Sequence, residues 1–195
     1  AGQPGNEVHY EIVMNQRLPR VILAFLAGGS LAVAGAVFQA LLRNPLAEPY
    51  ILGVSSGAGV GVLVGRVLLH TGGAATPLLA FVGAMTTCLV VYGIAQRRGR
   101  LDPFVLLLSG VIVNVFNGAL LLTLLLWADR NQVVDYIRWS MGAVPQWIWI
   151  ERLLLGRYAA WALAGWLLLM RRGAALNTMG LGDEVAESSG VPVHW

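Results

Sequence analysis

Serine and histidine are the residues of this chain whose types could support nucleophilic chemistry. The sequence GVSSG at 53–57 matches the G-x-S-x-G pattern of a nucleophile elbow, in which serine sits on a sharp turn between a strand and a helix. No strand is expected before this motif, because it opens an apolar helical run. The histidines His9, His70 and His194 lie outside or at the ends of the apolar runs, so no general base is expected beside the serines. We therefore predict no catalytic residue.

Nucleotide and metal chemistry also lack their residues. The sequence GAGVG at 57–61 has neither the spacing nor the βαβ context of a dinucleotide-binding loop. The chain contains no lysine, so it has no Walker lysine, and any ATP must be bound by a partner. The single cysteine, Cys88, lies within an apolar run and cannot form an intramolecular disulfide. We predict no metal site and no cofactor.

Polar side chains inside the apolar runs are the remaining candidates: Gln39, Ser55, Ser56, Asn114 and Asn117. In hydrocarbon each needs a hydrogen-bond partner or water. Asn114 and Asn117 are three residues apart on one helix face, so they could line an aqueous translocation path or hydrogen-bond to another helix. No aspartate or glutamate falls deep in an apolar run, which argues against a proton- or sodium-coupled carrier.

The elements that must position these residues are expected to be transmembrane helices. The 195 residues are 57% hydrophobic and 12% charged, roughly half the charge of a soluble domain. A membrane-spanning helix needs about 20 apolar residues. Five runs approach or meet that length, at 21–42, 51–69, 74–95, 103–127 and 153–170. We predict an all-α, polytopic transmembrane helical bundle in lipid. Nucleic acid is not an expected partner, because the arginines lie between apolar runs rather than on one polar face.

Close helix packing is indicated by small residues at every fourth position. Gly53, Gly57, Gly61 and Gly65 form such a stripe in the second run. Helices in lipid associate through close backbone approach and polar contacts rather than through hydrophobic burial. We expect these glycines to form a helix-packing face.

Arginine placement bears on orientation. Arginines cluster at 97–100 and at 171–172, and both loops would be cytoplasmic by the positive-inside rule. Arg17 and Arg20 would then lie outside, so the simple count of arginines is nearly balanced.

Several stretches together resemble one family of permeases. They are RLPR at 17–20, QALLRNPLAEP at 39–49, LGVSSGA at 52–58, LSGV at 108–111, WSMG at 139–142 and LGDEVA at 181–186, followed by Gly190. The chain resembles the FecCD-type permease subunit of bacterial ABC importers for iron-siderophores, haem and vitamin B12. The resemblance covers nearly the whole chain. Such permeases have about ten spans, so the chain looks like a fragment that starts in the loop after the first span and holds spans two to six.

The resemblance implies a function and partners. The permease would move a metal chelate, with an iron-siderophore favoured over haem or cobalamin, and it would catalyse no covalent chemistry itself. Its partners would be a cytoplasmic ABC ATPase, a periplasmic substrate-binding protein and a second permease copy, either identical or a close paralogue. It would lie in the bacterial inner membrane, with the start of this chain periplasmic and its end cytoplasmic. The alternatives are a secondary carrier or channel and an intramembrane enzyme.

The resemblance also assigns residue roles. Arg17 and Arg20 match periplasmic arginines that receive acidic residues of the binding protein, which accounts for their place outside. A cytoplasmic coupling segment at 176–191 would dock on the ATPase through Leu181, Gly182, Asp183, Glu184, Ala186 and Gly190. Negative charge in the first turn of its short helix suits the helix dipole. Ser189 departs from the leucine usual in the family.

Overall fold

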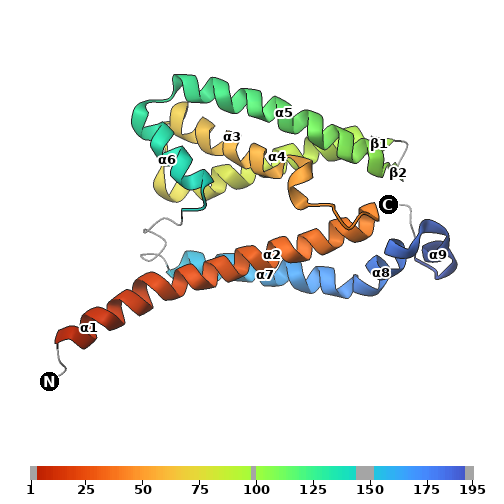
Figure 1. The fold of residues 1–195 in the computed structure, drawn as a ribbon, viewed down its shortest axis with the longest axis horizontal. Coiled ribbons are helices and arrows are strands. Elements are labelled where there is room, and N and C mark those ends of the chain that lie inside the picture. The colour runs from red at the N-terminus through yellow and green to blue at the C-terminus, as the bar shows by residue number, and fades with distance from the viewer. Residues whose placement is uncertain (1–3, 98–99, 144–151, 192–195) are drawn as a thin grey trace. The chain divides into compact units, whose positions relative to one another are not determined.

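The computed structural model describes residues 4–97, 100–143 and 152–191 (Figure 1). The chain forms two compact units. Unit 1 combines Ala1–Ala36 with Val144–Ala174, and unit 2 combines Val37–Ala143 with Ala175–Trp195. Each unit is built from helices, and each is described by itself below.

The described N-terminal part is one continuous helical run. It consists of α1, a π-helical segment and α2, over Pro4–Glu11, Ile12–Arg17 and Leu18–Leu42. In the π-helical turn the amide of Leu18 donates to the carbonyl of Val13, five residues earlier. Pro19 follows at once. Its ring has no N–H and would crowd the carbonyl four residues before it, so a widened turn accommodates it without ending the helix. A loop was expected here, and the chain is helical instead.

Unit 1 pairs the first part of α2 with α7 (Arg152–Arg171). Trp166 of α7 contacts α2 at two residues. Its ring meets the ring of Phe25 edge-on, with centroids 6.3 Å apart, and it covers Gly29, where a Cβ would come within 2.8 Å of the indole. The small residue at 29 therefore lets an aromatic side chain of α7 lie against the backbone of α2.

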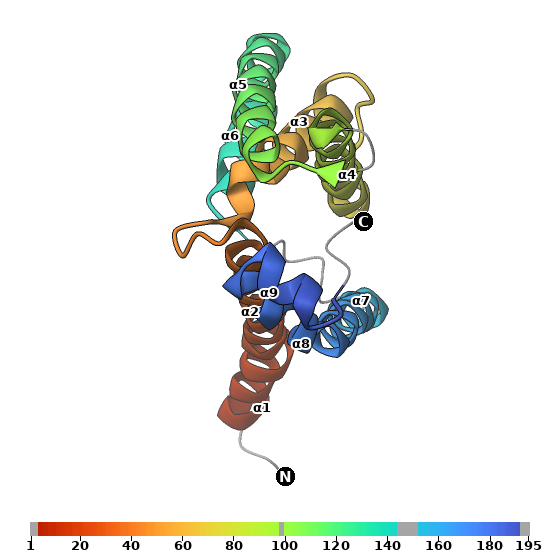
Figure 2. The ribbon, with the colours of Figure 1, turned by 90° about the vertical axis from the view of Figure 1, so that its right-hand side faces the viewer.

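Unit 2 is centred on three helices, α3 (Val54–Val67), α4 (Thr76–Ala95) and α5 (Pro103–Trp127), of which α4 runs antiparallel to α3. Figures 1 and 2 show them side by side. A 3-10 turn at Pro49–Leu52 precedes α3, and another at Gly73–Ala75 precedes α4. The largest fully buried side chains, Leu63, Val62 and Val91, belong to α3 and α4. The core of the unit therefore lies between these two helices.

Short elements complete the unit. The connection from α4 to α5 contains two-residue strands, β1 (Gln96–Arg97) and β2 (Arg100–Leu101), which pair antiparallel. α5 begins after Asp102, whose side chain accepts hydrogen bonds from the amides of Phe104 and Val105. The remaining helices are α6 (Arg130–Ser140), α8 (Gly173–Leu181) and α9 (Asp183–Ser188). α8 begins in unit 1 and enters unit 2 at Ala175.

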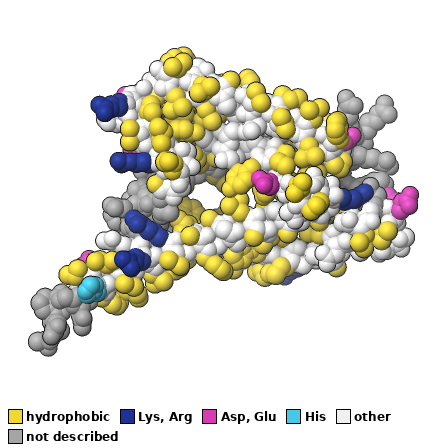
Figure 3. All heavy atoms as spheres, viewed as in Figure 1, with side chains coloured by type: hydrophobic (Ala, Val, Ile, Leu, Met, Phe, Trp, Pro, Cys, Tyr) yellow, Lys and Arg dark blue, Asp and Glu magenta, His cyan; other side chains and the backbone are white. Residues whose placement is uncertain are grey.

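Three helical runs in the described part of the chain are long and apolar enough to cross a membrane: Val8–Leu42, Thr76–Ala95 and Pro103–Trp127. α3, in the second expected span, has only 14 residues and would cover about 21 Å of a core about 30 Å thick. α7, in the fifth, has 20 residues and carries arginines at both ends. Hydrophobic side chains run along the visible face of unit 2 (Figure 3). The predicted all-α membrane bundle is confirmed.

Candidate functional site

The glycines of α3 bring its backbone against α4. A Cβ at Gly57 would collide with Thr87 and with the carbonyl of Gly83, and a Cβ at Gly61 would collide with the carbonyl of Leu79. No side chain larger than hydrogen fits at these two positions unless the helices separate. The close approach of α3 and α4 therefore depends on the spacing of the small residues.

The other two glycines of the stripe have different surroundings. A Cβ at Gly65 would meet the end of the Leu79 side chain, which is flexible. Gly53 has φ +70, a left-handed conformation that favours glycine, and it joins the 3-10 turn to the start of α3. A Cβ there would lie 3.4 to 3.5 Å from atoms of Thr87 and Asn114. Gly53 therefore shapes the turn as well as the packing.

Asn117 joins the three central helices through hydrogen bonds. Its Nδ2 donates to Thr87 Oγ1 at 3.1 Å and to Ser56 Oγ at 3.3 Å. Ser56 Oγ in turn donates to the carbonyl of Gly53 at 2.9 Å. Asn117 and Thr87 are each only 6% exposed. The cluster links α5 to α4 and to the start of α3, in a place where water does not reach Asn117 freely.

The five predicted path residues therefore fall into two groups. Asn117 and Ser56 are engaged between helices, whereas Gln39, Ser55 and Asn114 are exposed. Asn114 and Asn117 were expected to share one face. Three residues turn a helix by about 300°, so the two side chains point in directions about 60° apart. Asn117 therefore lies within the packed face and Asn114 lies at its edge.

The two predicted docking arginines lie on one helical run. Arg17 is the last residue of the π-helical segment and Arg20 is in the first turn of α2, and both are exposed. Their guanidinium groups offer planar donor arrays that suit carboxylates. The geometry is thus compatible with binding an acidic surface.

The predicted coupling segment at 176–191 comprises the larger part of α8, Gly182, α9 and the three residues that follow α9. Glu184 lies in the first turn of α9 and is exposed, as are Leu181 (74%) and Val185 (42%). Ala186 is fully buried and anchors the helix. Asp183 is the first residue of α9, and its side chain is not among those that the structure describes. The exposed part of the segment therefore combines an acidic residue with two apolar side chains.

Two glycines define the ends of α9. Gly182 precedes it with φ +132, and Gly190 follows it with φ +76, both outside the range that other residues adopt readily. At the C-terminal end Val191 donates its amide to the carbonyl of Ala186, and Gly190 donates to Glu187. These two bonds form a Schellman motif, in which a left-handed glycine ends the helix.

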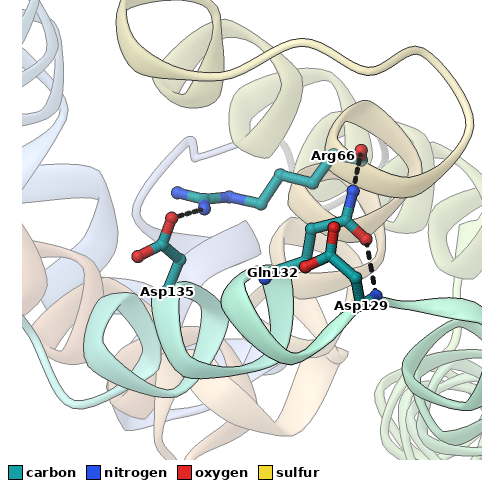
Figure 4. Close-up of polar contacts among 4 residues, drawn as sticks. All are labelled: Arg66, Asp129, Gln132 and Asp135. Carbon is teal, nitrogen blue, oxygen red and sulfur yellow. Dashed lines mark hydrogen bonds and ion pairs between the residues drawn. The ribbon is translucent and has the colours of Figure 1, made fainter.

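A polar network at the end of α3 was not anticipated from the sequence (Figure 4). Arg66 Nη1 contacts Asp135 Oδ2 at 2.7 Å, and Gln132 Nε2 donates to the carbonyl of Arg66 at 2.8 Å. Gln132 and Asp129 also form a reciprocal capping box at the start of α6. The spacing of Asp129 and Gln132 is the signal from which α6 could have been predicted.

Tyr136 fixes the middle of α6. Its hydroxyl lies 2.9 Å from the place of a Cβ at Gly59, next to Leu121. Burial raises the pKa of the Tyr136 phenol. The tyrosine thus occupies space that a glycine on α3 leaves open.

Comparison with known proteins identifies the family of this chain. The model of the FecCD transport family matches residues 2–195. The chain belongs to the FecCD transport family. The resemblance inferred from the sequence motifs is thereby confirmed.

FecCD relatives of this chain are transport permeases. This chain is 39% identical over 192 residues to the ABC transporter permease protein YvrB of Bacillus subtilis, and the match covers 96% of this chain and 53% of YvrB. It is 38% identical to the achromobactin transport system permease protein CbrC of Dickeya dadantii, and the match covers 94% of this chain and 52% of CbrC. It is also 38% identical to the vitamin B12 import system permease protein BtuC of Photorhabdus laumondii, and the match covers 94% of this chain and 54% of BtuC. The chain spans about half the length of these relatives.

A solved structure shares the FecCD chain's fold. It is an ABC transporter assigned to the metal-chelate type, in an inward-facing conformation, with a TM-score of 0.79 and 24% identity. The match covers 98% of this chain and 61% of the other. Membership of the FecCD transport family relates this chain to transport permeases.

Proposed function

We propose that this chain is part of the membrane subunit of an ATP-driven importer that carries a metal chelate into the cytoplasm. The observation that carries the proposal is the FecCD family match over residues 2–195. The favoured cargo is an iron-siderophore, with haem or cobalamin as alternatives, and relatives of the chain are named as permeases for iron(3+)-hydroxamate, hemin and vitamin B12. The absence of an acidic residue deep in the apolar runs of the sequence favours an ATP-driven importer over an ion-coupled carrier.

The partners follow from this function. A cytoplasmic ABC ATPase would dock on the segment from Leu181 to Gly190, where Leu181, Val185 and Glu184 are exposed. A periplasmic binding protein would dock on Arg17 and Arg20 through its own carboxylates. A second permease copy would complete the translocation path, and ATP would be hydrolysed by the separate ATPase subunit.

Two roles are proposed for the polar residues of unit 2. Gln39, Ser55 and Asn114 are exposed and would contact the cargo or water along the path. Ser56 and Asn117 would shape the path indirectly, because their hydrogen bonds hold α5 against α3 and α4. The glycines of α3 would keep these helices close enough for the bonds to form.

The proposed function also implies a location and an orientation, and the protein would lie in the bacterial inner membrane. Arg17 would be periplasmic, and α8 and α9 would be cytoplasmic. Two contacts within unit 2 fit this arrangement: the end of α2 meets the end of α8, and the end of α3 meets α6. Each contact joins segments that the proposed topology puts on the same side of the membrane.

Reconstitution tests the function. The complete gene product is placed in proteoliposomes with its ATPase and binding protein, and uptake of a ferric siderophore, haem or cobalamin is measured with and without ATP. Uptake should require both ATP and the binding protein. Equal uptake in vesicles that lack the ATPase would instead identify a secondary carrier or channel.

A further inference from the structure

Arg43, the residue that follows α2, has a strained backbone conformation. Its φ is +48, in the left-handed region that residues other than glycine seldom adopt. The amide of Asn44 bonds back to the carbonyl of Gln39, and the Asn44 side chain accepts from the amide of Leu46. The chain thus turns sharply at Arg43, which directs it away from the axis of α2.

The side chain of Arg43 reaches a segment far away in the sequence. Its Nε donates to the carbonyl of Met179 at 3.1 Å, across 136 positions of the chain. Met179 is in the last turn of α8, where carbonyls lack helical partners and carry partial negative charge. The same carbonyl accepts the amide of Gly182, the residue between α8 and α9. The guanidinium therefore binds at the joint of the two helices.

A second contact supports the joint. Gly180 of α8 lies beside Ala40 of α2, because a Cβ at Gly180 would be 4.0 Å from the Cβ of Ala40. Both residues belong to unit 2, as do Arg43 and Met179. The approach of Gly180 to Ala40 and the charged hydrogen bond from Arg43 to Met179 thus both hold the end of α8 to the end of α2.

We infer that Arg43 is a positioning residue that clamps the joint of α8 and α9 to the end of α2. The inference rests on the proposed function, and it adds a route by which the coupling segment acts on the transmembrane helices. When the ATPase displaces α9, the clamp carries the displacement into α2 and into the 43–49 turn that leads to α3. Without the clamp, α9 still docks, but its movement is taken up by Gly182.

Removal of the side chain can be separated from the effect of its strained backbone. Arg43→Gly deletes the guanidinium and retains a residue that adopts positive φ without cost. In the reconstituted importer this variant should bind the ATPase as the wild type does, while cargo transported per ATP hydrolysed falls about tenfold, the effect expected for one charge-assisted hydrogen bond. The matched control is His70→Gly, at the other described non-glycine residue with positive φ. The control should leave the ratio unchanged.

A reversible cross-link tests the contact and the rescue. Ala40→Cys with Gly180→Cys, in a Cys88→Ala background, places two Cβ atoms at a separation typical of disulfides. The disulfide should form on mild oxidation and restore the Arg43→Gly variant to within about twofold of wild-type coupling, with loss on reduction. The inference is overturned if the cysteines fail to join in an otherwise wild-type protein, if Arg43→Gly couples normally, or if the cross-link gives no rescue. Absence of ATP-driven uptake by the wild type would contradict the proposed function instead.

Discussion

Asn117 lies where three helices meet, and its two hydrogen bonds favour a packing role. An asparagine that lined an open path would offer its amide to water or to cargo. Here the amide donates to Thr87 and Ser56, and only 6% of the residue is exposed. Hydrogen bonds of this kind join helices in membranes, where each contributes about 0.6 kcal/mol on average and up to about 1.7 kcal/mol.

Replacement of Asn117 should therefore affect stability. Asn117→Ala removes the donor for two hydroxyl groups and should lower the free energy of unfolding of the complete permease by about 1 kcal/mol, measured by denaturant titration in detergent. Asn114→Ala, one turn away and exposed, is the control and should change stability by less than about 0.5 kcal/mol. A larger loss for Asn114 than for Asn117 would contradict the packing role.

The sequence could predict which residues are polar within the apolar runs, but not which of them are covered. Asn114 and Asn117 look equivalent in the sequence. Their difference depends on which helices flank α5 and at what rotation, and that information comes from the tertiary packing. The strain at Arg43 was likewise invisible, because nothing in the local sequence demands a positive φ there.

At the scale of elements, the contact of α3 with α4 is a close approach of two backbones. Gly57 and Gly61 on α3 face Gly83 on α4, and the backbones approach so closely that added methyl groups have no space. This spacing brings Ser56 and Thr87 within reach of Asn117. Helix packing and the polar cluster are thus two consequences of the same small residues.

Gly61→Ala should force the two helices apart. The added methyl would collide with the carbonyl of Leu79, so the free energy of unfolding should fall by about 2 kcal/mol. Gly93→Ala on α4 is the matched control, since a Cβ there meets no atom within 4 Å, and it should be close to neutral. Thermal unfolding of the two variants in detergent measures the difference. Equal stability of both would show that α3 and α4 pack less closely than described.

Long apolar helices could be predicted well from the sequence, because length and composition determine them. The expected runs at 74–95 and 103–127 coincide closely with α4 and α5. The helix before Arg17 and the helix α6 were missed. The first runs directly into Pro19, a residue that usually breaks a helix, and the second is too polar to register as a span.

At the scale of the whole molecule, the proposed importer needs its ends on opposite sides of the membrane. Exposed arginines at 17 and 20 would bind one soluble partner, and exposed residues around Glu184 would bind another.

Asp183→Asn combined with Glu184→Gln should reduce co-purification of the ATPase several-fold while leaving capture of the binding protein unchanged. Glu187→Gln, in the following turn of α9, is the control. Full ATPase retention in the double variant would remove the acidic turn from the interface.

Cysteine accessibility is the measurement that most directly tests the opposed positions of these two surfaces. Gln16→Cys and Ser189→Cys, both at exposed positions, are introduced separately into the complete permease with Cys88→Ala. A membrane-impermeant maleimide is then added to intact spheroplasts. Labelling of position 16 in intact cells, and of position 189 only after permeabilisation, is the expected result. Labelling of both positions from the same side would contradict the proposed importer.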